Sequence, residues 1–291
     1  MTQTQSPERR YRVGVVGAGT MGKGLVELFG TNESIQTIVW KSRDLITAKQ
    51  AMSQVHARWE KLGAKHKLDL ASIAKAPSKI RLVDNYQELS GLDCVIEAVS
   101  EDLYIKKAVF EELAKVQGEG GILASNTSSL SITALSRTVG IPSAVVGLHF
   151  FNPAPVMRLT EIISGFVTAP ETIEWAKEFA RTLGKEPVVV TEAPGFIVNR
   201  MLIPMINEAI AALAEGVASA DDIDKAMTLG ANHPLGPLAL ADLIGNDVNL
   251  SIMETLYSET GDPKYRAHPL LRKMVRANHL GRKTGVGFYN Y

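Results

Sequence analysis

The chain of 291 residues contains a single cysteine, no excess of either charge and no long apolar run. One cysteine excludes an internal disulfide framework and a Cys-based zinc site, and we expect no metal site. Lys plus Arg and Asp plus Glu both number 31, so no net field attracts nucleic acid or an anionic membrane. No segment approaches the ~20 apolar residues of a membrane span. We therefore expect a soluble, cytoplasmic protein without a nucleic-acid or membrane partner.

The N-terminal segment lacks the apolar core of a signal peptide. Residues 1–10 are polar and carry two arginines, and we expect them to form a disordered tail. The only thiol, Cys94, lies in the apolar run 93–99, and we interpret it as a buried core residue rather than a nucleophile.

From Tyr11 to about Val190, short apolar runs alternate with longer amphipathic stretches, which predicts βαβ units and a mostly parallel sheet. Strands are expected at 12–16, 35–40, 80–83, 94–98, 121–124, 144–148 and 187–190. Helices are expected at about 20–30, 44–62, 104–117, 131–139 and 170–183. After residue 192 the alternation gives way to helical stripes. The pattern predicts a Rossmann-type α/β domain at 11–192, followed by a smaller all-α domain at 193–291.

A glycine-rich segment follows the first predicted strand and fits the pattern G-x-G-x-x-G. Its residues are Gly17, Ala18, Gly19, Thr20, Met21 and Gly22. A plain strand-to-helix turn would also contain glycines. The strand before the segment, the helix after it and the second strand at Ile35 favour a dinucleotide loop, in which backbone N–H groups bind a pyrophosphate. We therefore expect a nicotinamide-dependent oxidoreductase.

The end of the second strand indicates which nicotinamide cofactor is bound. NAD-selective sites usually place an acidic residue there, on the ribose 2′-hydroxyl. This sequence has Lys41, Ser42 and Arg43 instead. A basic trio can bind a 2′-phosphate through charge-assisted hydrogen bonds. The sequence thus favours NADP over NAD, the alternative being that these residues solvate a surface loop.

A histidine and a glutamate twelve residues apart are candidates for acid–base chemistry. His149 ends the strand predicted at 144–148, and Glu161 lies in the apolar run 159–163. The connection at 151–155 can bring both side chains to one edge of the sheet, where a carboxylate would fix the tautomer of a general base. The alternatives are a structural histidine and an outward-facing strand glutamate.

Seven ordered blocks of the sequence, spread over nearly the whole chain, resemble the 3-hydroxyacyl-CoA dehydrogenase family, which includes bacterial 3-hydroxybutyryl-CoA dehydrogenases. The blocks are 17–22, 96–101, 124–130, 147–153, 194–200, 236–245 (Gly-Pro and Ala-Asp-Leu-Ile-Gly) and 280–289. The resemblance implies interconversion of a (3S)-3-hydroxyacyl thioester and its 3-oxoacyl form. It also implies a homodimer.

The same resemblance assigns roles to individual residues. His149 is the implied general base and Glu161 its partner, while Ser128 and Asn199 are implied to hold the 3-oxygen of the substrate. Ser129 is an alternative to Ser128, and a helix N-cap is the alternative role for Asn199.

Four further residues are implied to bind the cofactor. Glu101, Lys106 and Asn152 are placed at its nicotinamide half, and Lys283 is placed to reach the site from the C-terminal domain. For the two charged residues Glu101 and Lys106, simple solvation is the alternative.

The sequence departs from the family where coenzyme A is usually held. An ungapped count puts Ala57 and Ala64 where relatives often have a Ser and a Lys, although Lys61 lies between them. Thus a carrier-protein thioester remains an alternative to acyl-CoA. Two other hypotheses stay open. One is a non-catalytic, crystallin-like nucleotide-binding protein, and the other is a dehydrogenase of free 3-hydroxy acids that uses Arg158 or Arg200.

Overall fold

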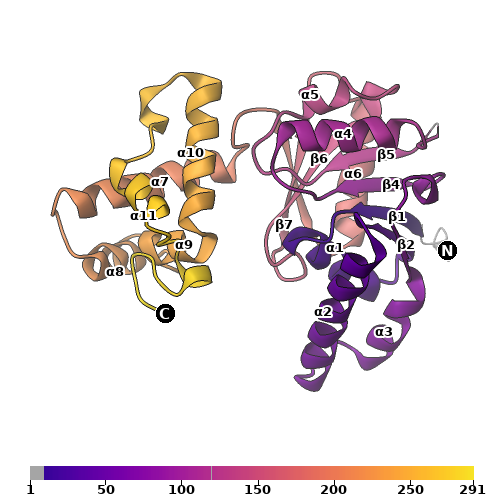
Figure 1. The fold of residues 1–291 in the computed structure, drawn as a ribbon, viewed down its shortest axis with the longest axis horizontal. Helices are drawn as coiled ribbons and strands as arrows, with labels where there is room; N and C mark the ends of the chain where they lie inside the picture. Colours follow the sequence, from indigo (N-terminus) through magenta and orange to yellow (C-terminus); the bar gives the residue numbers. More distant parts are fainter. Residues whose placement is uncertain (1–9, 119) are drawn as a thin grey trace, which may run out of the picture. The chain divides into compact units, whose positions relative to one another are not determined.

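The computed structural model describes residues 10–118 and 120–291 (Figure 1). All but the last residue of the expected N-terminal tail, 1–10, therefore lie outside the described residues. Two compact units divide the chain, the first ending at Glu192 and the second spanning Ala193–Tyr291.

An eight-stranded sheet forms the centre of the first unit within the described residues, in the order β3-β2-β1-β4-β5-β6-β7-β8. The strands are β1 (Tyr11–Val16), β2 (Ile35–Lys41), β3 (Ile80–Val83), β4 (Cys94–Glu97), β5 (Ile122–Ser125), β6 (Val145–Phe150), β7 (Leu159–Ser164) and β8 (Glu186–Thr191). Neighbours run parallel except β6 and β7, which are antiparallel. The predicted mostly parallel sheet is confirmed, with the strand order 3-2-1-4-5-6 of a dinucleotide-binding domain.

The helices of the first unit bury the apolar runs of the strands. They are α1 (Thr20–Thr31), α2 (Leu45–Ala64), α3 (Leu70–Lys75), α4 (Leu103–Ala114), α5 (Ile132–Ser136) and α6 (Pro170–Thr182). Phe29 of α1 and Phe179 of α6 meet edge to face with ring centroids 6.0 Å apart, and Trp59 of α2 joins the same core. Cys94 is fully buried, as predicted. Replacing one of these buried aromatic side chains by alanine would lower the free energy of unfolding by about 3–5 kcal/mol.

One strand and one α-helix of the first unit were not predicted. The run at Leu159–Ser164 is strand β7, which pairs with β6 on one side and β8 on the other. The short helix α3 has its N-terminus capped by the carboxylate of Asp69. Strand β2 also runs one residue further than expected, because Lys41 continues its pairing with β1 and β3. Short elements such as these are specified by their neighbours more than by their own pattern.

The second unit is helical, as predicted. Its helices are α7 (Val198–Ala214), α8 (Ala220–Gly230), α9 (Pro237–Ile244), α10 (Asn246–Thr260) and α11 (Pro269–Arg276). Ser219 caps α8 by accepting from the backbone N–H of Asp222. The buried carboxylate of Asp242 fastens the C-terminal aromatic segment by accepting from the backbone N–H groups of Phe288 and Tyr289, both at 3.0 Å.

Within the part of the chain that the structure describes, no helix is long and apolar enough to cross a membrane. Over the same residues, no three His, Cys, Asp or Glu side chains gather as a metal site requires.

Candidate active site

The glycine loop lies between β1 and α1, where the two outer glycines are needed for packing. Gly17 has a positive φ of 119°, and a Cβ added there would lie 2.5 Å from the carbonyl oxygen of Ala98. A Cβ on Gly22 would lie 2.1 Å from the oxygen of Gly17. Each contact is far below van der Waals distance, so both positions require glycine.

Gly19 differs from its two neighbours, because a Cβ there would meet nothing within 4 Å. It is the N-cap of α1 and makes no side-chain capping hydrogen bond. The first turn of α1 therefore presents backbone N–H groups to open space, which suits the pyrophosphate of a dinucleotide. On this observation the loop fits a nicotinamide dinucleotide.

The basic trio Lys41, Ser42 and Arg43, which begins at the last residue of β2, is not uniformly exposed to solvent. Lys41 is 8% exposed, and its ammonium lies 4.2 Å from the ring centroid of Tyr86. Burial lowers the pKa of Lys41, and the charges of Asp84 and Glu112 oppose this effect in part. Ser42 is buried as well. The trio therefore does not simply solvate a surface loop.

Arg43 is the exposed member of the trio, with 85% of its side chain accessible. It pairs with Asp44 across 3.3 Å. The Asp44 carboxylate also caps α2 by accepting from the backbone N–H and the hydroxyl of Thr47, at 2.6 and 3.0 Å. Asp44, the acid that pairs with Arg43, therefore also caps the N-terminus of α2.

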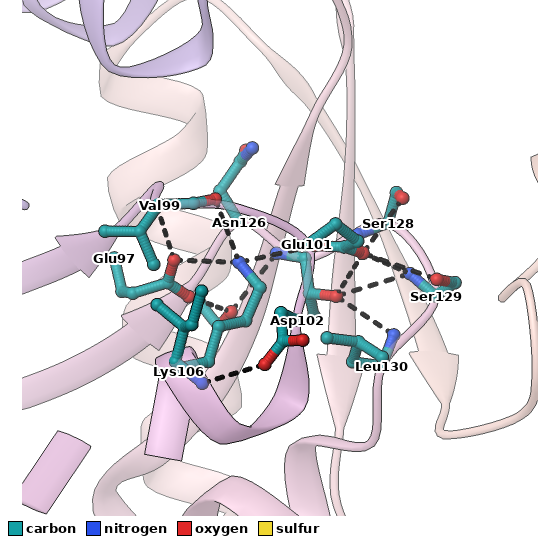
Figure 2. A network of polar contacts seen from close by, with 12 residues as sticks. Glu97, Val99, Glu101, Asp102, Lys106, Asn126, Ser128, Ser129 and Leu130 are labelled. Carbon is teal, nitrogen blue, oxygen red and sulfur yellow. Dashed lines mark hydrogen bonds and ion pairs between the residues drawn. The ribbon is translucent and has the colours of Figure 1, made fainter. Parts of the chain in front are cut away.

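A polar network occupies the carboxyl ends of β4 and β5 (Figure 2). Lys106 of α4 is 1% exposed, and its Nζ lies 2.8 Å from Glu97 Oε1 and 3.3 Å from Glu101 Oε2. The other oxygen of Glu97 accepts from Ser125 Oγ at 2.6 Å. Lys106 is therefore a buried, paired charge rather than a solvated one.

Glu101, the second glutamate of the network, accepts hydrogen bonds from the loop after β5. Glu101 Oε1 accepts from the backbone N–H of Ser128 at 2.8 Å, from its hydroxyl at 3.0 Å, and from the hydroxyl of Thr127 at 2.6 Å. Ser129 donates to the same oxygen. Burial opposes the ionisation of Glu101, but Lys106 and these hydrogen bonds outweigh it and lower its pKa. Ser129 is buried, whereas Ser128 is half-exposed and accessible to a ligand.

His149 and Glu161 lie directly opposite each other on β6 and β7. His149 Nδ1 is 2.7 Å from Glu161 Oε2, and the two residues are 6% and 1% exposed. The predicted proximity is confirmed. A buried carboxylate on Nδ1 orients the imidazole ring, an arrangement that suits acid–base chemistry.

The loop after β6 is held by a buried lysine. Lys185 is 5% exposed and donates to the carbonyl oxygens of Ala154 and Met157, at 2.6 and 2.8 Å. Burial lowers its pKa. Asn152, at the start of the loop, is exposed and lines a cavity of about 450 Å³ with residues of α1 and α2. The cavity residues are Thr20, Lys23, Gly24, Glu27, Gln54, Val55, Ala57, Arg58, Lys61, Asn152, Pro153 and Pro155.

Two predicted site residues belong to the second unit. Helix α7 begins after Ile197, so Asn199 is its second helical residue and not its N-cap. Lys283 pairs with Asp247 across 2.5 Å. Among the arginines proposed for a free acid, Arg158 is exposed and paired with Glu186 in the first unit.

Sequence reasoning missed the inner members of this site. Glu97, Ser125 and Thr127 lie within blocks already noted for the resemblance. Nothing in those blocks shows that Glu97 contacts Lys106 and Ser125, or that Thr127 contacts Glu101. Lys185 had no signal besides its position after the helix-ending Gly184. A glutamate inside a fully buried strand, as in Ile96-Glu97, is the one clue that a buried cation pairs with it.

Comparison with known families agrees with this geometry. The NAD binding domain of 3-hydroxyacyl-CoA dehydrogenase matches residues 12–193, and the C-terminal domain of the same family matches 195–291. The chain belongs to the 3-hydroxyacyl-CoA dehydrogenase family. It is thus a nicotinamide-dependent oxidoreductase acting on a CH–OH group.

Individual relatives cover most of the chain. It is 50% identical to a 3-hydroxybutyryl-CoA dehydrogenase of Clostridioides difficile over 96% of this chain and 99% of that protein. A 3-hydroxyadipyl-CoA dehydrogenase of Escherichia coli is 39% identical, over 96% of this chain and 58% of that protein. The crystal structure of (S)-3-hydroxybutyryl-CoA dehydrogenase from Ralstonia eutropha superposes with a TM-score of 0.92 at 44% identity, covering 97% and 99% of the two chains.

Proposed function

We propose that this enzyme interconverts a short (3S)-3-hydroxyacyl-CoA, such as 3-hydroxybutyryl-CoA, and its 3-oxoacyl form, with His149 as general base. The observation that carries the proposal is the buried His149–Glu161 pair, which lies in the sheet whose strand β1 leads into the glycine loop. The 50% identity to a 3-hydroxybutyryl-CoA dehydrogenase supports the acyl group.

The chemistry follows from the orientation of the dyad. Glu161 contacts Nδ1, so Nε2 is the ring nitrogen proposed to take the proton of the substrate 3-hydroxyl. A bound nicotinamide supplies the hydride acceptor. The Ser128 hydroxyl donates to Glu101 in this structure. It is proposed to turn from Glu101 to the 3-oxygen of a bound substrate, where its proton would stabilise the charge that develops. Asn199 of the second unit is proposed to share that task.

The cofactor is proposed to lie along the carboxyl edge of the sheet. Residues 17–22 would hold its pyrophosphate, and the region of Glu101, Lys106 and Asn152 its nicotinamide half. Lys283 is a weaker member of the proposed site because it already pairs with Asp247. Since β1 lies between β2 and β4, the two halves of a dinucleotide spread to either side of it, as at other topological switch points.

We propose NADP(H) as the preferred cofactor. The support is the absence of a carboxylate at the last position of β2, where Lys41 stands, together with the accessible guanidinium of Arg43. Michaelis constants for NAD(H) and NADP(H) measured side by side test this. A tenfold preference for NAD would contradict it. Lys41→Asp should move the preference toward NAD. Lys49→Asp, at an exposed position of α2 outside the cavity, is the matched control.

Coenzyme A is the proposed carrier. The cavity between α1, α2 and the loop after β6 is lined by Lys23, Arg58 and Lys61, cations suited to phosphate groups. Glu27 is paired with Arg58 across 2.8 Å, so the acid of this cavity is already neutralised. The alternative is the same chemistry on a carrier-protein thioester. The ratio of kcat/KM for acetoacetyl-CoA and an acetoacetyl carrier protein separates the two.

The deciding experiment follows nicotinamide absorbance with acetoacetyl-CoA, an acetoacetyl carrier protein and free acetoacetate. Oxidation of NADPH or NADH with a thioester but not with the free acid is expected. Turnover of the free acid at equal rate would favour a free-acid dehydrogenase. Nucleotide binding without turnover of any of the three would favour a non-catalytic, crystallin-like protein.

A further inference from the structure

The network at the ends of β4 and β5 is a closed ring of contacts (Figure 2). Lys106 pairs with both Glu97 and Glu101, and Glu101 accepts a hydrogen bond from the Thr127 hydroxyl. The ring returns to Glu97 through Ser125, whose hydroxyl accepts from the Thr127 N–H at 3.2 Å and donates to Glu97. The ring ties two strands, helix α4 and the 127–130 loop together.

Both carboxylates of the ring carry a negative charge. Glu97 accepts from three donors, namely the Val99 N–H at 2.6 Å, Lys106 Nζ and Ser125 Oγ, and it is completely buried. Carboxylates surrounded only by donors are ionised. Glu101 is likewise surrounded by donors. Two carboxylates and one ammonium leave the ring with one net negative charge.

This charge lies in the sheet between the glycine loop and the dyad. Glu97 is in register with Val16, the last residue before Gly17, and with Ser125, which is in register with Gly147, two residues before His149. On the proposed function, the nicotinamide must lie between the pyrophosphate loop and His149. A nicotinamide ring is cationic when oxidised and neutral when reduced, so a fixed negative charge acts on one form only.

We propose that Glu97 is a positioning residue that holds Lys106 and gives the ring its excess negative charge, so that the site favours the oxidised nicotinamide over the reduced one. The inference rests on the proposed function. It deepens that function by assigning the enzyme a built-in bias toward the oxidised cofactor. The N-terminus of α4, which carries Lys106, is capped by the carboxylate of Asp102. Asp102 is kept in every variant below, so the cap of this helix does not change.

The test measures dissociation constants for the oxidised and reduced cofactor in the full chain, by calorimetry and by fluorescence of the reduced form. Glu97→Gln should weaken the oxidised form relative to the reduced one by about tenfold, the effect of one unit charge over roughly 12 Å at an effective dielectric constant of about 20. If Glu97→Gln does not fold, Glu101→Gln takes its place, because the Glu101 side chain is half-exposed. It should shift the ratio of the two dissociation constants in the same direction. Glu111→Gln on the exposed surface of α4 is the matched control and should leave the ratio unchanged.

The double variant Glu97→Gln/Lys106→Gln separates charge from position. It loses the buried pair but keeps one net negative charge through Glu101, so its ratio should return to within twofold of the wild type. An unchanged ratio in both single variants would overturn the inference, as would a double variant whose ratio stays at the Glu97→Gln value. Failure of the wild type to bind either cofactor form would instead overturn the proposed function.

Discussion

At the scale of single residues, the His149–Glu161 pair concentrates the proposed chemistry. The two side chains share a buried contact of 2.7 Å between Nδ1 and Oε2. A carboxylate in that place keeps the ring oriented and stabilises the imidazolium that forms as the substrate loses its proton. We therefore expect a substitution of His149 to affect turnover more than cofactor binding.

We expect His149→Gln to lower kcat by on the order of 10²-fold or more, the usual contribution of a general base. Cofactor dissociation constants should stay within about threefold, since no cofactor contact is proposed for this side chain. Steady-state kinetics and calorimetry on the purified variant measure both. Wild-type turnover in His149→Gln would remove the histidine from the mechanism.

Cys94 provides a second test at this scale. Its side chain is completely buried in β4, and burial raises the pKa of the thiol far above its ordinary value. Only the thiolate reacts readily with alkylating agents. We expect no labelling by iodoacetamide at pH 8 in the folded protein and complete labelling in denaturant, measured by mass spectrometry. Rapid labelling of the folded chain would show that β4 opens readily.

At the scale of elements, the turn from β1 into α1 uses its glycines for two different purposes. Gly17 and Gly22 allow strand and helix to approach, whereas Gly19 borders open space. Substitution at these positions should therefore separate folding from binding.

Gly22→Ala should lower the free energy of unfolding by about 1–3 kcal/mol, as overpacking of a buried contact does. The added methyl group would lie 2.1 Å from the Gly17 carbonyl, which already accepts from Trp40 Nε1. Gly19→Ala is the matched substitution. It should leave stability within about 0.5 kcal/mol yet weaken dinucleotide binding. Urea unfolding and cofactor titration measure the two effects, and equal stability in both variants would contradict this account.

At the scale of the whole molecule, the helical unit leaves large apolar side chains accessible. Met201, Leu229 and Leu243 are 71%, 76% and 52% exposed. Exposed apolar side chains can be buried by contact with a second copy of the chain. We propose that the protein forms a homodimer, as the family resemblance implies.

Light scattering at micromolar concentration should give twice the 31.5 kDa mass of the chain. Dilution should lower the thermal midpoint if the partner stabilises the fold, because binding of a second copy adds free energy that depends on concentration. A monomer at all concentrations would contradict the dimer.

The sequence by itself determined those features that repeat or follow a fixed local rule. Alternating apolar runs gave the parallel sheet, and the glycine spacing gave the dinucleotide loop. The Ser219 cap and the stripe containing Ile203, Ile206 and Ile210 gave the helical unit. Even the proximity of His149 and Glu161 followed, because twelve residues allow one reversal of the chain.

Only the tertiary structure decided which buried charges meet. Glu97 and Lys106 are nine positions apart, but Ser125 reaches Glu97 from β5, and Thr127 reaches Glu101 from the loop after β5. Lys185, just before β8, reaches the loop after β6. Such contacts depend on strand order and side-chain direction, which no local pattern encodes. For the same reason β7 was missed, since an apolar run becomes a strand only when two neighbours accept its backbone hydrogen bonds.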